Sequence, residues 1–160
     1  MSRIMWSITS EAREAPIHYH WYTEYPDESG PMDLFRDLVS QVQVDPYLEA
    51  HIIGEFASML SRMTKGKLKA MDEIKPVRIS ASEPLFELRA TFPLQGSEEF
   101  ILRVYNAEPP SIGSTVIGLH MHRKVIVGSD SEIKALQNLE INKAVQAYYR
   151  GKPGQWGLPR

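Results

Sequence analysis

Residues 85–92 read Leu85-Phe86-Glu87-Leu88-Arg89-Ala90-Thr91-Phe92, an alternation of apolar and polar side chains that decides the fold. The same alternation returns in Phe100-Ile101-Leu102-Arg103-Val104-Tyr105 and in Val116-Ile117-Gly118-Leu119-His120-Met121-His122. Because side chains along a strand point alternately to its two faces, we predict three β-strands that share one apolar face. The side chains expected on that face are Phe86, Leu88, Ala90, Phe92, Phe100, Leu102, Val104, Ile117, Leu119 and Met121.

The opposite face of these strands carries cations and imidazoles. Its side chains are Arg89, Arg103, Tyr105, His120 and His122. A sheet that is apolar behind and carries Arg and His in front suggests an anionic ligand. The alternative is a solvated sheet face, since antiparallel sheets commonly leave one face in water.

The expected strand register brings two arginines together. If the first two strands form an antiparallel hairpin in which their phenylalanines pair, Arg89 lies opposite Arg103. Like charges that face each other destabilise a strand pair, and a bound anion relieves that repulsion. In the next hairpin either Arg103 or Tyr105 opposes Gly118. The second of these registers brings His120 opposite Arg103.

Length and composition are typical of one folded domain. Of the 160 residues, 42% are hydrophobic and 24% are charged. We predict an N-terminal extension over residues 1–16, a single domain over 17–150 and a flexible tail over 151–160. No apolar run reaches the roughly 20 residues that span a bilayer, and the start lacks the apolar stretch of a signal peptide, so we expect no membrane partner and a cytoplasmic location. The absence of cysteine excludes disulfides and thiolate zinc sites.

The net charge of −2 conceals an asymmetry along the chain. Residues 1–60 contain 3 Lys and Arg against 10 Asp and Glu, whereas residues 61–160 contain 15 against 10. A basic half suits nucleic acid, because neutralising phosphates releases condensed counterions. The basic stretch 65–78 is a candidate phosphate-contacting edge, although such a run of charges is equally typical of a solvated connection.

Helices are predicted on either side of the three strands. Residues 17–23 are aromatic-rich and predict a first strand. Pro31 suits the first turn of one helix, and Asp45 is an N-cap residue followed by proline for a second helix, which Gly66 ends. Ser129 begins the capping sequence of a last helix. The predicted class is therefore α+β, with an N-terminal strand, a two-helix hairpin, a three-stranded antiparallel meander and a C-terminal helix.

Five stretches in this order carry a family resemblance. They are Pro31-Met32-Asp33-Leu34-Phe35-Arg36-Asp37-Leu38-Val39, Leu85-Phe86-Glu87-Leu88-Arg89, Phe100-Ile101-Leu102-Arg103-Val104-Tyr105, Gly118-Leu119-His120-Met121-His122-Arg123-Lys124 and Glu140-Ile141-Asn142-Lys143-Ala144. With the order of elements, they resemble the phage-derived, HigB-like branch of the RelE/HigB toxin superfamily, over about residues 17–150. The resemblance implies a RelE-like fold.

The resemblance also implies an activity, that of a type II toxin–antitoxin system toxin that cuts messenger RNA on the ribosome. Such cleavage needs a base for the ribose 2′-hydroxyl, cations for the dianionic phosphorane and an acid for the departing 5′-oxygen. The scheme requires no metal or other cofactor. The implied partners are mRNA, the ribosome and a neutralising helix-turn-helix antitoxin.

Four residues of the polar face are candidates for catalysis: Arg89, Arg103, His120 and His122. The arginines suit a bidentate grip on phosphate, and a histidine, with an ordinary pKa of about 6.5, serves as base or acid near neutrality. The candidate RNA-binding residues are Lys67, Lys69, Lys75, Arg78, Arg123, Lys124, Tyr148 and Tyr149.

Two other functions stay open. A non-catalytic RelE-fold protein that binds RNA, DNA or a protein partner fits the acidic first half and the presence of Val125 where the family has a second lysine. A histidine metal site is conceivable if the strands that carry His18-x-His20 and His120-x-His122 adjoin. Our main interpretation assigns no metal ligands.

Overall fold

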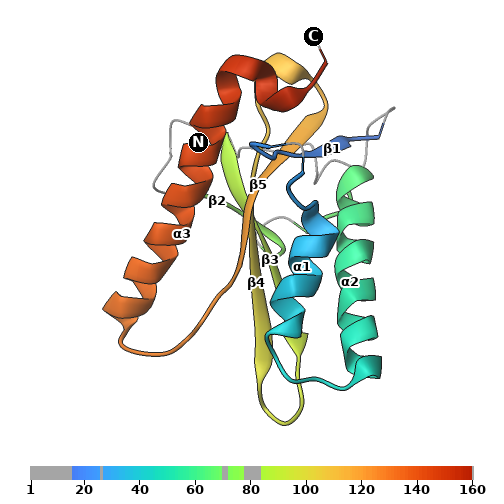
Figure 1. Ribbon diagram of the computed structural model, residues 1–160, viewed down its shortest axis with the longest axis vertical. Helices are drawn as coiled ribbons and strands as arrows, with labels where there is room; N and C mark the ends of the chain where they lie inside the picture. The colour runs from blue at the N-terminus through green and yellow to red at the C-terminus, as the bar shows by residue number, and fades with distance from the viewer. Residues whose placement is uncertain (1–15, 26, 70–71, 78–83, 160) are drawn as a thin grey trace.

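The computed structural model describes residues 16–25, 27–69, 72–77 and 84–159, which form an α+β arrangement around a five-stranded mixed sheet (Figure 1). The strands are β1 (His18–Trp21), β2 (Ile74–Pro76), β3 (Leu85–Pro93), β4 (Glu99–Ala107) and β5 (Thr115–Arg123). The α-helices are α1 (Pro31–Ser40), α2 (Pro46–Thr64) and α3 (Asp130–Gly151), and two short 3-10 helices are η3 (Pro110–Ile112) and η4 (Lys152–Gly157).

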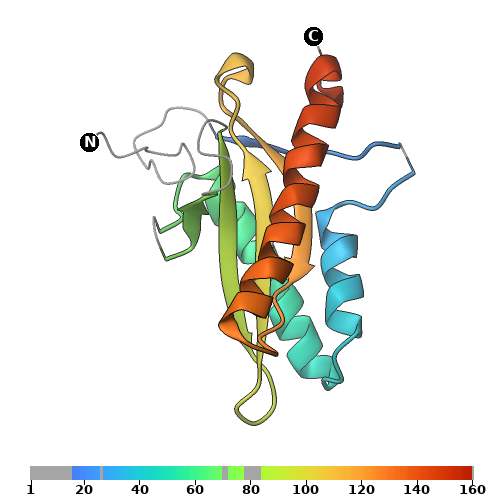
Figure 2. The same ribbon diagram turned by 90° about the vertical axis from the view of Figure 1, so that its left-hand side faces the viewer.

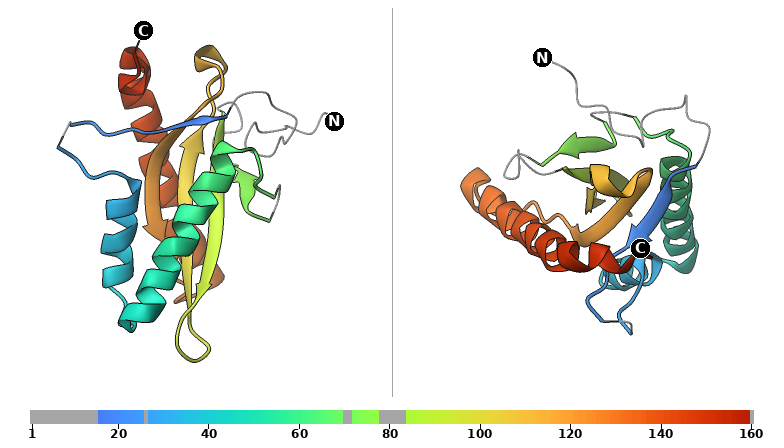
Figure 3. Two further views of the ribbon diagram at one scale, coloured as in Figure 1. Left: turned by 90° about the vertical axis from the view of Figure 1, so that its right-hand side faces the viewer. Right: turned by 90° about the horizontal axis from the view of Figure 1, so that it is seen from above.

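The sheet is the middle of three layers. Figure 2 shows α3 crossing one face of the sheet, and Figure 3 shows α1 and α2, which run antiparallel, against the other face. Each face has its own apolar cluster, one built with Phe35 and Phe56 of the helix hairpin and one built with Ile141 and Ala144 of α3. The polar face of the predicted strands is therefore partly covered by a helix and is not a fully solvated surface.

The strand order is β1-β5-β4-β3-β2. The three predicted strands β3, β4 and β5 pair antiparallel in succession, as expected. The sheet as a whole differs from a simple meander, because β1 adds to β5 in parallel and β2 adds to β3 at the other edge. Strand β2 lies in the basic stretch that we interpreted either as a phosphate-contacting edge or as a solvated connection. With three residues, one of them Pro76, it is too short for an alternation of side chains to be recognised.

The ends of the helix hairpin follow the sequence signals. Pro31 is the first residue of α1, and the Asp45 side chain accepts a hydrogen bond from the Leu48 N–H at 2.9 Å at the start of α2. After the end of α2, Gly66 adopts a φ of +68°, a conformation that glycine enters without steric cost, and its N–H bonds to the Met63 carbonyl.

The register of the sheet matches one prediction and corrects another. Arg89 lies opposite Arg103, as the paired phenylalanines predict. Neither register that we predicted for β5 occurs, because an irregularity beside Tyr105 shifts the pairing so that His120 opposes Tyr105 and His122 opposes Arg103. An extra residue in one strand reverses the faces that follow it.

The expected common face of Ile117, Leu119 and Met121 is accordingly wrong. Met121 packs in the cluster of the helix hairpin, whereas Ile117 and Leu119 belong to the cluster beneath α3. His120 and His122 remain together on the α3 side of the sheet, because they follow the irregularity. Their rings are parallel within 10°, with centroids 6.0 Å apart.

Residues 152–157 form η4 and pack onto the domain, whereas we predicted a flexible tail over 151–160. Trp156 is 3% exposed within η4, and its indole N–H donates to the Tyr148 carbonyl at 3.0 Å. The Trp156 carbonyl in turn lies 2.7 Å from His20 Nε2 on β1. Through these two contacts, Trp156 joins η4 to α3 and to the sheet.

Candidate functional site

The α3 side of the sheet gathers four cations around one carboxylate. Lys75 of β2 opposes Glu87 of β3, and Arg89 Nε lies 2.9 Å from Glu87 Oε1. Arg103 of β4 opposes Arg89, and Lys124, just after β5, interacts electrostatically with all four of these groups. This set, Lys75, Glu87, Arg89, Arg103 and Lys124, is called the basic cluster below. It carries an excess of positive charge within the sheet layer.

Arg103 is the buried member of the basic cluster. Its exposed fraction is 7%, and its Nη1 donates to its neighbouring Leu102 carbonyl at 3.0 Å. Its Nε has no hydrogen-bond partner among the described residues. Burial, followed by the charge of Arg89, lowers the pKa of Arg103 below its ordinary value. A guanidinium held in this way is destabilised and attracts an anion.

A groove opens beside the basic cluster. It has a volume of about 470 Å³ and lies between strands β2 and β3 and helix α3. Lys75, Glu87 and Arg89 line its sheet side, and polar side chains such as Gln137 and Asn138 line its helix side. Its cations outnumber its one carboxylate, that of Glu87, so the charge of the groove suits a phosphodiester.

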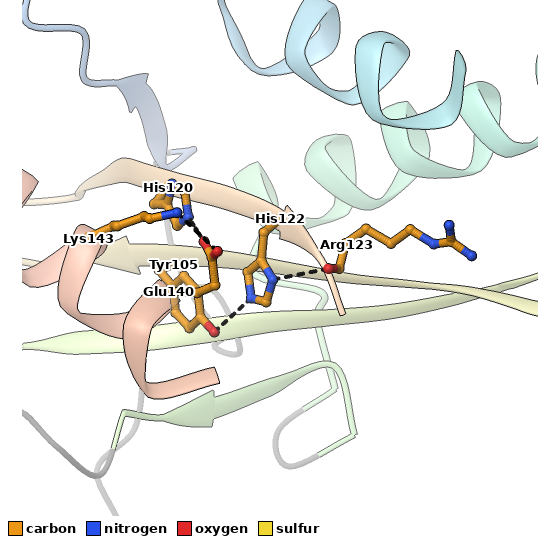
Figure 4. A network of polar contacts seen from close by, with 6 residues as sticks. All are labelled: Tyr105, His120, His122, Arg123, Glu140 and Lys143. Carbon is orange, nitrogen blue, oxygen red and sulfur yellow. Dashed lines mark hydrogen bonds and ion pairs between the residues drawn. The ribbon is translucent and has the colours of Figure 1, made fainter. Parts of the chain in front are cut away.

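Tyr105, which is buried, and His122, which is partly buried, form a hydrogen-bonded pair beside the basic cluster (Figure 4). His122 Nδ1 lies 3.2 Å from the Arg123 carbonyl, which only accepts hydrogen bonds, so Nδ1 carries the proton. Nε2 of the neutral ring therefore accepts from the Tyr105 hydroxyl at 3.0 Å. Burial raises the pKa of Tyr105 and lowers that of His122 to about 4, which fits this neutral arrangement. Both nitrogens of His122 are thus occupied.

The low pKa of His122 predicts a pH dependence of stability. Between about pH 6.5 and pH 4 the unfolded chain binds a proton at His122 that the folded chain does not, so stability falls as the pH falls through this window. In His122→Gln we expect that contribution, at most about 1.4 kcal/mol per pH unit, to vanish. Urea unfolding at about pH 7, 6 and 5 measures it.

An exposed histidine provides the control for this experiment. His51 is exposed on α2, so His51→Gln is expected to keep the wild-type slope. A slope in His122→Gln equal to that of the wild type would contradict the neutral state of the partly buried His122.

His120 has a different partner, which sequence reasoning missed. Its Nε2 contacts Glu140 Oε2 of α3, and Glu140 Oε1 accepts from Lys143 Nζ at 3.1 Å (Figure 4). Burial acts to raise the pKa of Glu140, but the bonds from His120 and Lys143 bring it below its ordinary value. Glu140 entered our sequence analysis only as part of a helix motif. The spacing of Glu140 and Lys143 predicts an ion pair on one helical face, but it does not reveal that His120 lies opposite Glu140.

The two histidines and the basic cluster do not line one common cavity. His120 and Lys143 line a hollow of about 540 Å³, which also includes Trp21, Glu24 and Arg150. His122 and Lys124 line a smaller hollow of about 120 Å³. The predicted catalytic set is therefore brought to one side of the sheet, but Arg89 and His120 face different hollows.

The predicted RNA-binding residues are dispersed. Lys67 and Lys69 are exposed on the connection between α2 and β2, and Arg78 lies outside the described residues. The Arg123 guanidinium lies 5.3 Å from the ring centroid of Phe100, in the cluster of the helix hairpin. Lys75 and Lys124 are the predicted lysines that join the basic cluster.

The two tyrosines of α3 also differ from each other. Tyr148 is 4% exposed, and its ring centroid lies 5.2 Å from that of Trp156, so it is a packing residue and not an open platform for a base. Tyr149 is 46% exposed, and Lys152 Nζ lies 5.8 Å from its ring centroid. Tyr149 is accordingly the accessible ring of the two.

The histidine pairs do not meet as a metal site requires. Strands β1 and β5 adjoin, but the parallel register places His18 beside Thr115 and His20 beside Ile117. Within the ranges that the structure describes, there is no group of three or more His, Cys, Asp or Glu side chains placed to hold a metal ion. The geometry gives the hypothesis of a histidine metal site no support.

Comparison of the chain with models of known families, with curated proteins and with solved structures finds no match. Among the helices in the described ranges, none has both the length and the apolar character needed to cross a membrane.

Proposed function

We propose that the chain is an mRNA endoribonuclease of the RelE/HigB toxin class, with RNA phosphates bound at the basic cluster. The observation that carries the proposal is the pairing of Arg89 with Arg103 across β3 and β4. In the basic cluster around this pair, the Glu87 carboxylate is the only negative charge among four cations. A phosphodiester supplies the missing negative charge. The observed order contains the predicted strand, two helices, three antiparallel strands and helix, with β2 added before β3, and this order supports the proposal.

Each side chain has a role that its surroundings suit. Arg89 and Lys75 line the open groove and stabilise the charge that develops on the phosphorane. Arg103, buried behind them, adds to the positive potential without touching the substrate. His120 is the candidate base for the ribose 2′-hydroxyl, because one of its nitrogens is left without a described hydrogen-bond partner, whereas both nitrogens of His122 are bonded.

The resemblance supplies the remaining parts of the proposal. The substrate is mRNA on the ribosome, the reaction needs no metal, the location is the cytoplasm, and the antitoxin is a helix-turn-helix protein. None of these follows from the charges of the site, which specify a phosphate ligand.

A second candidate function is RNA binding without cleavage. The specific observation in its favour is that Arg89 and His120 line different hollows, so a phosphate held at Arg89 is not thereby placed at His120. In this case the basic cluster binds RNA and His120 has no chemical role.

Inducible expression in a bacterium tests the proposal. We expect the wild-type chain to arrest growth and translation, and the purified protein to cut ribosome-bound mRNA in the presence of EDTA. His120→Ala should lower the rate of cleavage by about 100-fold or more, because the general base is lost, and it should keep RNA binding. Harmless expression of folded wild-type protein that neither cuts nor binds RNA would overturn the proposal. Binding without cleavage would favour the second candidate.

A further inference from the structure

Glu140 connects the last helix to the candidate base. One carboxylate oxygen contacts His120 Nε2 on β5, and the other accepts from Lys143 one turn further along α3. The Glu140 side chain is 23% exposed and the His120 side chain 24%, so both groups lie at the boundary between the protein and a hollow. Carboxylate–imidazole contacts of this kind fix the orientation of a histidine ring.

The contact also fixes which nitrogen carries the proton. An ionised carboxylate only accepts hydrogen bonds, so His120 Nε2 must donate, and the neutral ring is then the Nε2–H tautomer. Nδ1 is left as the unprotonated nitrogen, and no described residue bonds to it. His120 lines the hollow of about 540 Å³, which is large enough to admit part of a nucleotide.

We propose that Glu140 is a positioning residue for RNA cleavage: it holds His120 in the tautomer whose Nδ1 accepts the proton of the ribose 2′-hydroxyl. This inference rests on the proposed function. The 2′-oxygen attacks the adjacent phosphorus, its proton passes to Nδ1, and the bond from phosphorus to the 5′-oxygen breaks to leave a 2′,3′-cyclic phosphate. A water molecule protonates the leaving 5′-oxygen, and the resulting hydroxide takes up the proton that His120 then returns to solvent.

Glu140 stays ionised throughout this step and stabilises the imidazolium of His120. Its charge is the nearest among several that face the ring. Glu140 and Lys143 face it from α3, Tyr105 from β4 and His122 from β5. The hollow beside it adds the charged side chains of Glu24, Asp27, Glu28 and Arg150. A pH profile of cleavage reports on this whole set, so the tautomer must also be measured directly.

Lys143 makes the substitution Glu140→Gln informative. Lysine only donates hydrogen bonds, so the amide oxygen of the variant should turn to Lys143 and its NH2 group to His120 Nε2. The ring then has to accept at Nε2 and carry its proton on Nδ1, the wrong tautomer for the proposed base. In the double variant Glu140→Gln with Lys143→Met, the amide is free to turn its oxygen to His120, and the original tautomer returns.

Two readouts on the full chain test this inference. Long-range proton–nitrogen NMR of the labelled protein should show His120 with its proton on Nε2 in the wild type and on Nδ1 in Glu140→Gln. Cleavage of ribosome-bound mRNA should fall by about 10-fold or more in Glu140→Gln, since misorienting a base of this kind is costly, and recover in part in the double variant. Glu132→Gln, the same change in the first turn of α3, is the control and should match the wild type.

The outcomes separate the two proposals. Wild-type protein that shows the Nε2–H tautomer but cuts no RNA would overturn the proposed function and, with it, the catalytic role of Glu140. Wild-type protein that cuts RNA while Glu140→Gln keeps full rate and an unchanged pH profile would overturn the positioning role alone. An Nδ1–H tautomer in the wild type would overturn it as well.

Discussion

Replacing Arg89 with alanine is expected to lower RNA cleavage by about 100- to 1,000-fold, the usual cost of removing one group that stabilises transition-state charge. Arg89 is the arginine of the basic cluster that lines the open groove, with 26% of its side chain exposed. RNA affinity should fall too, and the dependence of log affinity on log salt should become shallower by about 0.7 for one lost phosphate contact. Growth arrest and gel-shift titrations at several salt concentrations measure these effects.

Two further variants show whether the loss of cleavage comes from lost phosphate binding or from a disturbed fold. Arg89→Ala leaves the buried Glu87 carboxylate without its close partner, so Arg89→Lys, which keeps the charge but not the bidentate geometry, should give an intermediate loss in a fully folded protein. Arg36→Ala is the matched control, because Arg36 is exposed on α1 and pairs with Asp33 at 3.5 Å. Equal activity of Arg89→Ala and Arg36→Ala would contradict phosphate binding at the basic cluster.

Replacing the neighbouring Arg103 is expected to raise the stability of the fold. Arg103 is buried beside a like charge, so Arg103→Met removes a desolvated guanidinium and is expected to stabilise the fold by about 1 kcal/mol or more. If the proposed RNA binding holds, we expect the same change to weaken it, because the positive potential at the groove falls. A variant that gains stability while it loses affinity marks a residue kept for its ligand. Marked destabilisation of Arg103→Met would instead make Arg103 a structural group.

The pairing of these arginines could be predicted because it depends on local patterns. Alternation defines β3 and β4, and the paired phenylalanines set the register between them. The irregularity beside Tyr105 could not be predicted in this way. One extra residue leaves the alternation within each half of β5 intact and changes only which face of the sheet the apolar side chains of each half point to. The two registers that we considered for Gly118 both assumed regular pairing, and Asn106 is its actual partner.

The contacts of α3 lie beyond sequence patterns for a different reason. Glu140 meets His120 across a separation of 20 residues, because α3 folds back over the sheet. Trp156 is buried for the same reason, although its Pro- and Gly-rich surroundings read as an open tail. Residues that make such contacts are recognised only once the layers are in place. This explains why Arg89 and Arg103 were predicted as site residues and Glu140 was not.

The largest loss of stability is expected from Phe35→Ala. Phe35 is fully buried where α1 meets the sheet, and its ring centroid lies 4.2 Å from that of Phe56, 5.7 Å from Phe92 and 5.9 Å from Phe100. Truncating a buried phenylalanine costs about 3–5 kcal/mol, because the transfer energy is lost and a cavity stays. Against a typical total of about 5–15 kcal/mol, this lowers the melting temperature by roughly 10 °C.

Urea unfolding at neutral pH measures this cost, and Tyr47→Ala is the control, since Tyr47 is 89% exposed on α2 and its truncation should cost little. A loss below about 1 kcal/mol in Phe35→Ala would contradict the packing of the hairpin onto the sheet. Phe35 lies on the face opposite the basic cluster. A folded Phe35→Ala protein assayed well below its melting temperature should therefore keep its RNA affinity, whereas Arg103→Met loses affinity in a stabler fold. The two variants together separate the residues that stabilise the sheet from the residues that bind its proposed ligand.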